Sequence, residues 1–437
     1  MFESFPDDFL WGAALTGHRI DGGNFASDWW RWEQRPGRIT GGSTSKTTAD
    51  HWNRYEKDMD LARDLGLNTL QLTLEWSRIE PEPGKFDEVA LEHYADEIQG
   101  MRDRGIEPIV ILQQVTLPEW FARKRGWNRK DAVKKFGAYT EVVAKKLANN
   151  VRWWIPIAEP MHWITRAYFD KQWPSAYGGV SRSQSALQNM ARAHAAAYGI
   201  LHQHRDDAMV GPSIRLRSLT PHNPYSAWDA RTARRESRRC NQTYLDALVH
   251  GRWTVAFSRD KTVANTADFI GASYYGEERI RFRLTRPRSV FVETVDTDGK
   301  GIRKETYKPN PAGLGSLLEE LQKYDRPVLV TGNGLVDGDD AAQCSDLLDH
   351  TAIIRHALES NISVLGYMYR SLLDGMEWTE GLAHHRALVH VDFDKLTRTP
   401  NTIAYLYKEL CETGSVRPGT IAQFCPNWKS PIQETSS

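Results

Sequence analysis

Short apolar runs alternate with amphipathic segments along most of the chain. The apolar runs include residues 69–74 (TLQLTL), 108–113 (PIVILQ) and 327–331 (PVLVT), and each has the length of one buried strand. The segments between them, among them residues 90–104 and 184–205, repeat apolar residues at helical spacing. The pattern therefore predicts strands and helices that alternate along the sequence.

Strands that are apolar along their whole length suit a parallel sheet with both faces covered. The alternation occurs about eight times, which predicts a (β/α)8 barrel, also called a TIM barrel, as a single domain over residues 1–437. A doubly wound open sheet is the alternative, but no GxGxxG motif or phosphate loop opens any of the helices. Residues 216–252 and 277–308 are polar, rich in arginine and irregular, so we expect long βα-loop insertions over the C-terminal mouth of the barrel.

Composition and charge exclude several classes of protein. Basic and acidic residues number 56 each, so no strong field draws the chain to nucleic acid or to an anionic membrane. No segment approaches the roughly 20 apolar residues of a membrane span, and the N-terminus lacks the regions of a signal peptide. Four scattered cysteines without a CxxC pair are expected to be reduced thiols. We therefore expect a cytoplasmic protein with no nucleic-acid or membrane partner. Nothing in the sequence indicates its oligomeric state.

A series of short motifs follows in order along the chain. They are FLWG at 9–12, DWWRW at 28–32, EWSRIEP at 75–81, TLPEW at 116–120, Glu159–Pro160, DFIG at 268–271, Tyr274–Tyr275, Asn333–Gly334, SLLD at 371–374, Glu377–Trp378 and VDFDKLTR at 391–398. With these motifs, residues 4 to about 412 resemble glycoside hydrolase family 1, the β-glucosidase family, and residues 413–437 form a C-terminal tail. The resemblance implies a (β/α)8 fold, hydrolysis of O-glycosidic bonds and a small-molecule glycoside or sugar as ligand.

The two carboxyl groups of a retaining glycosidase are the next features that the resemblance locates. It implies that Glu159 is the general acid and base, with Ala158 in place of the asparagine that would bind the sugar 2-hydroxyl. The nucleophile would stand in the segment 331–334, where this chain has Gly332. Glycine has no side chain that could form a glycosyl ester. We therefore predict a site that retains its proton donor and has a vacant nucleophile position.

Several other positions of the implied sugar site also depart from the family pattern. The replacements are Arg19 for a glutamine, Gln71 for an arginine that supports the nucleophile, Gln113–Gln114 for two histidines, and Arg370 for the tryptophan floor of the pocket. Tyr275, Glu377 and Trp378 match the pattern. One engineered change would not bring the others, so we interpret the set as natural divergence. The chain lacks both the nucleophile carboxylate, at Gly332, and the arginine that supports it, at Gln71. Because both are absent, neither charge is left buried without its partner.

The new arginines admit two interpretations. Arg19 and Arg370 either bind an anionic group on the ligand, such as a uronate, sulfonate or phosphate, or pair internally and fill the pocket. The internal partners would be Glu377, Glu159 or Asp374. Trp378 either stacks against the sugar ring or only packs in the wall of the pocket. Tyr275 either donates a hydrogen bond to a ligand or a water, or makes a hydrogen bond within the barrel mouth that has only a structural role. Strand alternation sends one of Gln113 and Gln114 to the core, and Gln114 is our candidate sugar contact.

Two further clusters have structural interpretations. The arginine-rich run 231–239 is typical of a solvated helix face rather than a polyanion site. His384 and His385 have no third ligand at metal-binding spacing, so we predict no metal. No motif for a redox cofactor is present either, and we expect none.

Three hypotheses follow from these residues. The first is a glycosidase in which Glu159 is the general acid and no enzyme group is the nucleophile. Inversion by a water would need a base, for which Asp21, Tyr275 and Glu377 are the candidates; alternatively a 2-acetamido substituent, for which Ala158 leaves room, attacks from within the substrate. The second is a catalytically inactive, carbohydrate-binding barrel. The third is elimination or transfer on a modified sugar.

Overall fold

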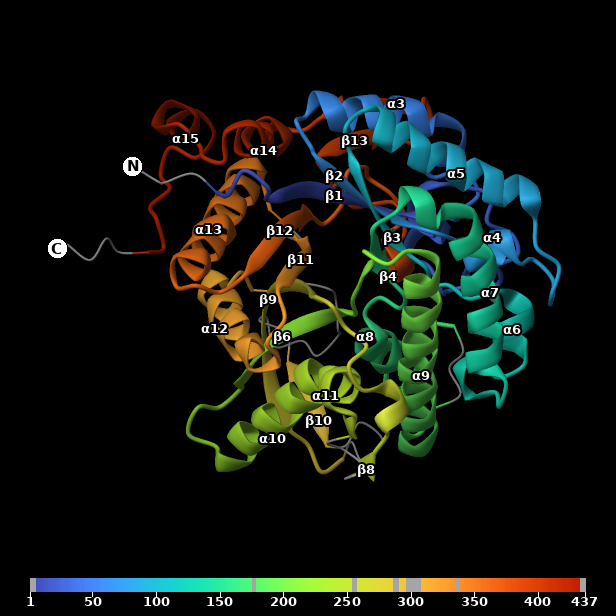
Figure 1. Ribbon diagram of the computed structural model, residues 1–437. Helices are drawn as coiled ribbons and strands as arrows, with labels where there is room; N and C mark the ends of the chain where they lie inside the picture. The colour runs from blue at the N-terminus through green and yellow to red at the C-terminus, as the bar shows by residue number, and fades with distance from the viewer. Residues whose placement is uncertain are drawn as a thin grey trace.

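A closed ring of parallel strands forms the centre of the molecule in the computed structural model, which describes residues 5–174, 178–253, 258–285, 291–295, 308–334 and 338–432 (Figure 1). The ring runs through β1 (Leu10–Thr16), β2 (Thr69–Thr73), β3 (Glu107–Ile111), β4 (Trp153–Ile155), β5 (Met209–Val210), β6 (Ser213–Pro221), β9 (Ile270–Phe282), β11 (Val328–Asn333) and β12 (Val364–Tyr369). β12 pairs with β1, and β4 pairs with β5. β5 and β6 are two parts of one strand separated by Gly211–Pro212, and β6 pairs with β9. The predicted (β/α)8 barrel is confirmed.

Helices cover the outside of this ring (Figure 1). The longer ones are α3 (His51–Asp64), α5 (Glu88–Asp103), α7 (Ala132–Leu147), α9 (Val180–His204), α12 (Pro311–Leu321), α13 (Asp340–Glu359) and α14 (Thr402–Thr413). One apolar core lies between the helices and the sheet. A second fills the inside of the barrel and consists mainly of Ile109, Ile111, Trp153, Ile155, Phe269, Leu329 and Met368. Strands buried on both faces therefore explain the continuous apolar runs in the sequence.

The two polar insertions contain more regular structure than the sequence suggested. Within residues 216–252, β6 continues to Pro221 and the helices α10 (Ala227–Ser237) and α11 (Thr243–His250) follow. The expectation of an irregular segment is wrong here, because Thr232, Ala233 and Glu236 are buried while most of the arginines of the run 231–239 face outward. In the second insertion β9 extends to Phe282 and pairs antiparallel with β10 (Val292–Val295). Much of the remainder, residues 286–290 and 296–307, lies outside the described residues.

Two other expectations can be compared with the structure. All four cysteines are free, as predicted. Among the described residues, none of the helices combines the length and the apolar character that crossing a bilayer requires. The segment expected as a C-terminal tail includes a short helix, α15 (Pro418–Phe424), which contacts α13 and α14.

A buried histidine connects α3 to α5. The two ring nitrogens of His51 lie 2.8 Å from a carboxylate oxygen of Asp58 and 3.0 Å from one of Glu97. Asp58 also accepts a hydrogen bond of 2.7 Å from Arg398, which lies in the hairpin of β13 (Val389–Asp392) and β14 (Thr397–Pro400). Burial lowers the pKa of His51, but the hydrogen bonds and charges of Asp58 and Glu97 outweigh it and raise this pKa to about 10.

Substituting His51 with glutamine is expected to cost most stability at low pH. The folded protein keeps the His51 proton up to a pKa of about 10, whereas the unfolded chain loses it near the ordinary pKa of 6.5. The stabilisation is therefore complete below pH 6.5 and is lost as pH rises toward 10. Urea unfolding of the native protein and of His51→Gln between pH 6 and pH 10 measures it. A difference in unfolding free energy that stays constant over this range would contradict the assignment.

Candidate active site

Most of the predicted site residues line a single cavity near the carboxyl ends of the barrel strands. They are Arg19, Gln114, Glu159, Tyr275, Arg370 and Trp378. The cavity volume is about 60 Å³, far below the roughly 300–1,000 Å³ of most ligand pockets. Glu377 lies behind this lining and contacts it through the two arginines. The cavity lies at the end of the barrel where TIM-barrel enzymes carry their chemistry.

Glu159 sits at the turn from the fourth strand into α8 (Pro160–Ile164). Its backbone is left-handed, with φ of 49°, a conformation that a non-glycine residue keeps only where the surroundings impose it. The Glu159 N–H donates a hydrogen bond of 2.7 Å to the carbonyl of Ser213. The side chain accepts a short hydrogen bond from the Ser273 hydroxyl. These contacts hold the carboxyl group at the cavity wall.

Gly332 lies near the end of β11, opposite Ser273 of β9. The sequence predicted a vacancy beside it, and the structure corrects this prediction. A Cβ atom at Gly332 would lie only 2.7 Å from the hydroxyl oxygen of Tyr275 and 3.3 Å from the Cβ of Ser273. A phenol from the neighbouring strand therefore occupies the space that a side chain at this position would enter.

Arg19 and Arg370 share the carboxylate of Glu377, one arginine on each oxygen. Arg19 also donates from its Nε to the Met376 carbonyl at 3.1 Å. Burial lowers the pKa of the Arg19 guanidinium, Glu377 opposes this shift, and the nearby charge of Arg370 adds to it. Of the partners considered from the sequence, Glu377 is the one that the geometry assigns to both arginines.

A third arginine, Arg215, lines the cavity together with Arg19 and Arg370, and the sequence analysis did not identify it. We call these three residues the cationic wall. Arg215 lies on β6 with its guanidinium carbon 4.5 Å from the centre of the Tyr275 ring. Its Nη1 is 2.9 Å from Nε2 of His162 and 3.9 Å from a carboxylate oxygen of Glu159. The alternation of arginine and apolar residues in the segment 213–217 could have revealed this position.

The glutamines divide as strand alternation requires. Gln114 lines the cavity and accepts a hydrogen bond of 2.9 Å from Thr73, whereas Gln113 is buried and donates to the Thr116 carbonyl at 3.2 Å. Gln71 is a further lining residue. Its side-chain oxygen is buried and has no hydrogen-bond partner within the described parts of the chain. A buried amide oxygen without a donor is one feature of the cavity that a ligand hydroxyl would satisfy.

Trp378 belongs to an aromatic wall on one side of the cavity. Its ring centre is 4.7 Å from that of Trp29 and 5.7 Å from that of Trp173. The ring of His18 lies nearly parallel to it, at 6.0 Å. Trp173 also lines the cavity.

The candidate bases differ in their access to the cavity. Asp21 is not part of its lining; it lies 3.8 Å from Arg78, and burial raises the pKa of its carboxyl to about 7. Glu377 already contacts two arginines through both oxygens. Tyr275 is the one of the three that lines the cavity.

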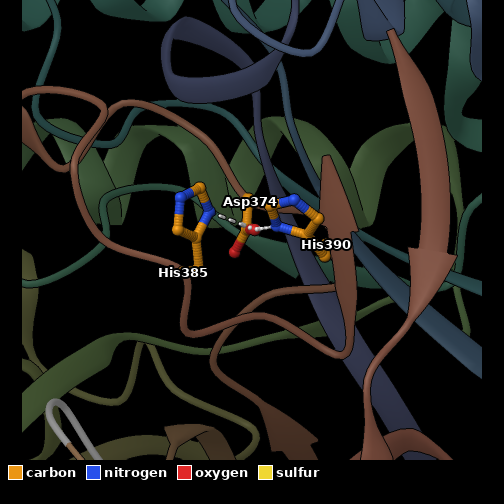
Figure 2. A group of neighbouring side chains, drawn as sticks. All are labelled: Asp374, His385 and His390. Carbon is orange, nitrogen blue, oxygen red and sulfur yellow. Dashed lines mark hydrogen bonds and ion pairs between the residues drawn. The ribbon is translucent and has the colours of Figure 1, made fainter. Parts of the chain in front are cut away.

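The sequence offered no third ligand at metal-binding spacing from His384 and His385, but the structure brings Asp374 and His390 to His385, without His384. Asp374 Oδ2 lies 2.8 Å from Nδ1 of His385 and 2.9 Å from Nδ1 of His390 (Figure 2). The other oxygen of Asp374 accepts from the backbone N–H groups of Arg386 and Ala387. Because each ring directs its Nδ1 atom to the same carboxylate oxygen, hydrogen bonds account for the contacts, and the cluster anchors the loop before β13.

The model of glycosyl hydrolase family 1 matches residues 1–415. β-Glucosidase A of Acetivibrio thermocellus is 27% identical over 93% of this chain and 98% of its own length. β-Glucosidase A of Thermotoga maritima is 25% identical over 95% of this chain and 99% of its own. The structure of a β-glycosidase from Pyrococcus horikoshii superimposes with a TM-score of 0.88 and 30% identity, covering 97% of this chain and 98% of the other. A β-glucosidase from T. maritima in complex with glucoimidazole gives a TM-score of 0.86 at 23% identity, covering 95% and 100%.

Proposed function

Since the chain belongs to glycosyl hydrolase family 1, we propose that it hydrolyses the O-glycosidic bond of an anionic sugar, with Glu159 as general acid and base. The convergence of three arginines on one cavity carries this proposal. Arg19, Arg215 and Arg370 bring three guanidinium groups to one largely buried site, and their contacts there include the carboxylates of Glu159 and Glu377. Arginine is the residue best suited to hold a carboxylate or phosphate group of a ligand in such a site.

A carboxylate on the substrate would compete with Glu377 for the same guanidinium groups. Arginine binds carboxylate and phosphate groups through two parallel hydrogen bonds. In the structure, Glu377 contacts both arginines from within the protein, with one arginine on each carboxylate oxygen. Exchange of this internal carboxylate for one on the ligand would keep both guanidinium groups paired.

Glu159 would act on the leaving-group oxygen. It first donates a proton to that oxygen, and its carboxylate then accepts a proton from the incoming water. With glycine at position 332, the group that attacks the anomeric carbon is not a carboxylate at the family position. Direct attack by a water would give inversion, with Glu159 as acid only and another group accepting the proton of the water, whereas a 2-acetamido group beside Ala158 would give retention.

Initial rates on matched aryl glycosides test the proposal. The purified protein is expected to hydrolyse 4-nitrophenyl β-D-glucuronide with a kcat/KM at least about tenfold above that for the β-D-glucoside, the effect of one charge-assisted hydrogen bond. This preference should fall in Arg370→Gln and persist in Arg152→Gln, an arginine near the surface with a half-exposed side chain. Equal or faster hydrolysis of the neutral glucoside would contradict the anionic assignment. A 2-acetamido glycoside in the same panel tests internal attack.

The second candidate is a barrel that binds an anionic carbohydrate without turning it over. The small cavity and the engagement of Glu377 by both arginines favour it. It predicts that glucuronate raises Tm while no glycoside of the panel is hydrolysed. Binding to the folded state alone stabilises it by about 2.7 kcal/mol at a ligand concentration one hundred times Kd.

A further inference from the structure

We propose that the phenol of Tyr275 is the nucleophile of this site and replaces the carboxylate that Gly332 cannot supply. The proposal rests on the function proposed above. It specifies that hydrolysis takes place by two displacements at the anomeric carbon, with net retention of configuration. Tyrosine is a known nucleophile in glycoside hydrolysis, because sialidases use it. Sequence reasoning considered Tyr275 as a hydrogen-bond donor or a base.

The position of the Tyr275 hydroxyl is the first argument. It lies 2.7 Å from the point where a Cβ of residue 332 would be. The oxygen thus lies next to the Cβ position of the residue that provides the nucleophile in the family pattern. It reaches this point from β9, the strand beside β11, and lines the cavity.

The relation of this hydroxyl to the proton donor is the second argument. Ser273 precedes Tyr275 by two residues, so the two side chains lie on the same face of β9. Ser273 donates its hydroxyl proton to Glu159. The strand β9 therefore holds Glu159 in place through Ser273, and it presents the phenol of Tyr275 from the same face. Two displacements at one anomeric carbon need these two groups in the same cavity.

The charges around the phenol are the third argument. The guanidinium carbons of Arg215 and Arg370 lie 4.5 Å and 5.8 Å from the ring centre, and Arg19 interacts with Tyr275 electrostatically. Nearby positive charges favour the ionised form of an acid. The same arginines that would hold an anionic substrate therefore also stabilise a phenolate in the cavity.

The chemistry balances in two steps. Tyr275 loses its proton to water, and the phenolate oxygen attacks the anomeric carbon while the bond to the leaving-group oxygen breaks and that oxygen takes the proton of Glu159. Water then attacks the same carbon, the Glu159 carboxylate accepts a proton from it, and the bond to the Tyr275 oxygen breaks. A phenol ionises near pH 10, far more readily than a sugar alcohol, so the second step has a good leaving group.

Substitution of Tyr275 by phenylalanine separates this role from a structural one. With 4-nitrophenyl β-D-glucuronide as the probe, kcat is expected to fall by at least about 10³-fold, as in other enzymes deprived of their nucleophile. Tyr274→Phe is the matched control, because its hydroxyl points to the Asn310 carbonyl and away from the cavity. A Tyr275→Phe rate within tenfold of the native rate would overturn the proposal.

Covalent trapping identifies the nucleophile directly. After incubation with 2-deoxy-2-fluoro-β-D-glucuronyl fluoride, peptide mass spectrometry is expected to find the fluorosugar on Tyr275. Nuclear magnetic resonance of the first product should show the β-anomer. An adduct on another residue, or an inverted first product, would refute Tyr275 as nucleophile and leave the glycosidase assignment intact. Absence of both turnover and labelling across the panel would refute both proposals.

A stability experiment tests the geometry without any substrate. The methyl group of Gly332→Ala must push the Tyr275 hydroxyl aside, so this variant is expected to have a lower Tm. The same substitution in a Tyr275→Phe background should lower Tm by clearly less, because the obstructing oxygen is gone. Equal Tm losses in the two backgrounds would show that the hydroxyl does not occupy the position that the proposal requires.

Discussion

Replacing Glu159 with glutamine lowers kcat by about 10²- to 10⁴-fold, the usual contribution of a positioned general acid. The amide preserves the size of the side chain and its hydrogen bond from Ser273, but it cannot give a proton to the leaving-group oxygen. The loss should be large for an alkyl glucuronide, whose leaving alcohol needs that proton. It should be small in the first step for a 2,4-dinitrophenyl glucuronide, whose phenolate leaves unassisted.

The measurement compares kcat and KM for these two leaving groups in the native protein and in Glu159→Gln. Glu119→Gln is the control, since this partly exposed glutamate pairs with Arg31 and Arg123 away from the cavity. An equal effect on both leaving groups would mean that the residue positions the substrate rather than protonates it. Unchanged kinetics would remove Glu159 from the mechanism.

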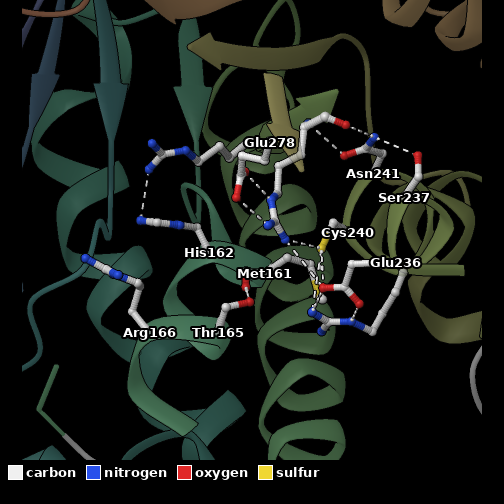
Figure 3. Close-up of polar contacts among 12 residues, drawn as sticks. Met161, His162, Thr165, Arg166, Glu236, Ser237, Cys240, Asn241 and Glu278 are labelled. Atoms are coloured by element: carbon white, nitrogen blue, oxygen red, sulfur yellow. Dashed lines mark hydrogen bonds and ion pairs between the residues drawn. The ribbon is translucent and has the colours of Figure 1, made fainter. Parts of the chain in front are cut away.

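Replacing Arg217 with methionine lowers the unfolding free energy by about 3–5 kcal/mol, the cost of removing one partner of a buried ion pair. Its Nε and Nη2 donate to the two oxygens of Glu278 at 2.6 Å each, and its Nη1 lies 3.4 Å from Glu236 and 3.2 Å from the Cys240 sulfur. Figure 3 shows these partners gathered beside α10. Burial lowers the pKa of Arg217, but the two carboxylates and Cys240 raise it well above its ordinary value.

Urea unfolding at pH 7 gives the size of this effect. Arg63→Met is the matched control and should lose less than about 1 kcal/mol, because Arg63 is half exposed in its pair with Asp64. Adding Glu278→Leu to Arg217→Met should recover part of the loss by removing the buried carboxylate that has lost its two hydrogen bonds from Arg217. A loss no larger than that of the control would indicate that water reaches the cluster. Since Arg215 lies two residues earlier on β6, the cluster also fixes the strand that lines the active site.

The hydrophobic pattern predicted alternating strands and helices, and the absence of a phosphate-binding motif favoured a barrel over a doubly wound sheet. Segments such as 108–112 and 327–331 carry apolar residues on both faces because helices cover one side of the sheet and the barrel core fills the other. Most arginines of residues 231–239 are exposed, as expected, but the five arginines of this run also line a cavity of about 740 Å³. The helix α10 was not recognised, because its buried positions carry aspartate, threonine, alanine and glutamate rather than large apolar side chains. The helix α11 was missed although it buries tyrosine, leucine and valine.

The sequence by itself determined which groups stand at the motif positions of the candidate active site: a carboxyl at Glu159, no side chain at Gly332, and cations at Arg19 and Arg370. These are properties of single residues at motif positions. The tertiary structure decided what each group contacts. It placed the Tyr275 hydroxyl beside Gly332, put both arginines on Glu377 and added Arg215 to the wall. Residues as far apart in sequence as Arg19 and Glu377 meet only when the barrel closes, and a distance across a closed ring is set by the packing of all its strands rather than by any local pattern.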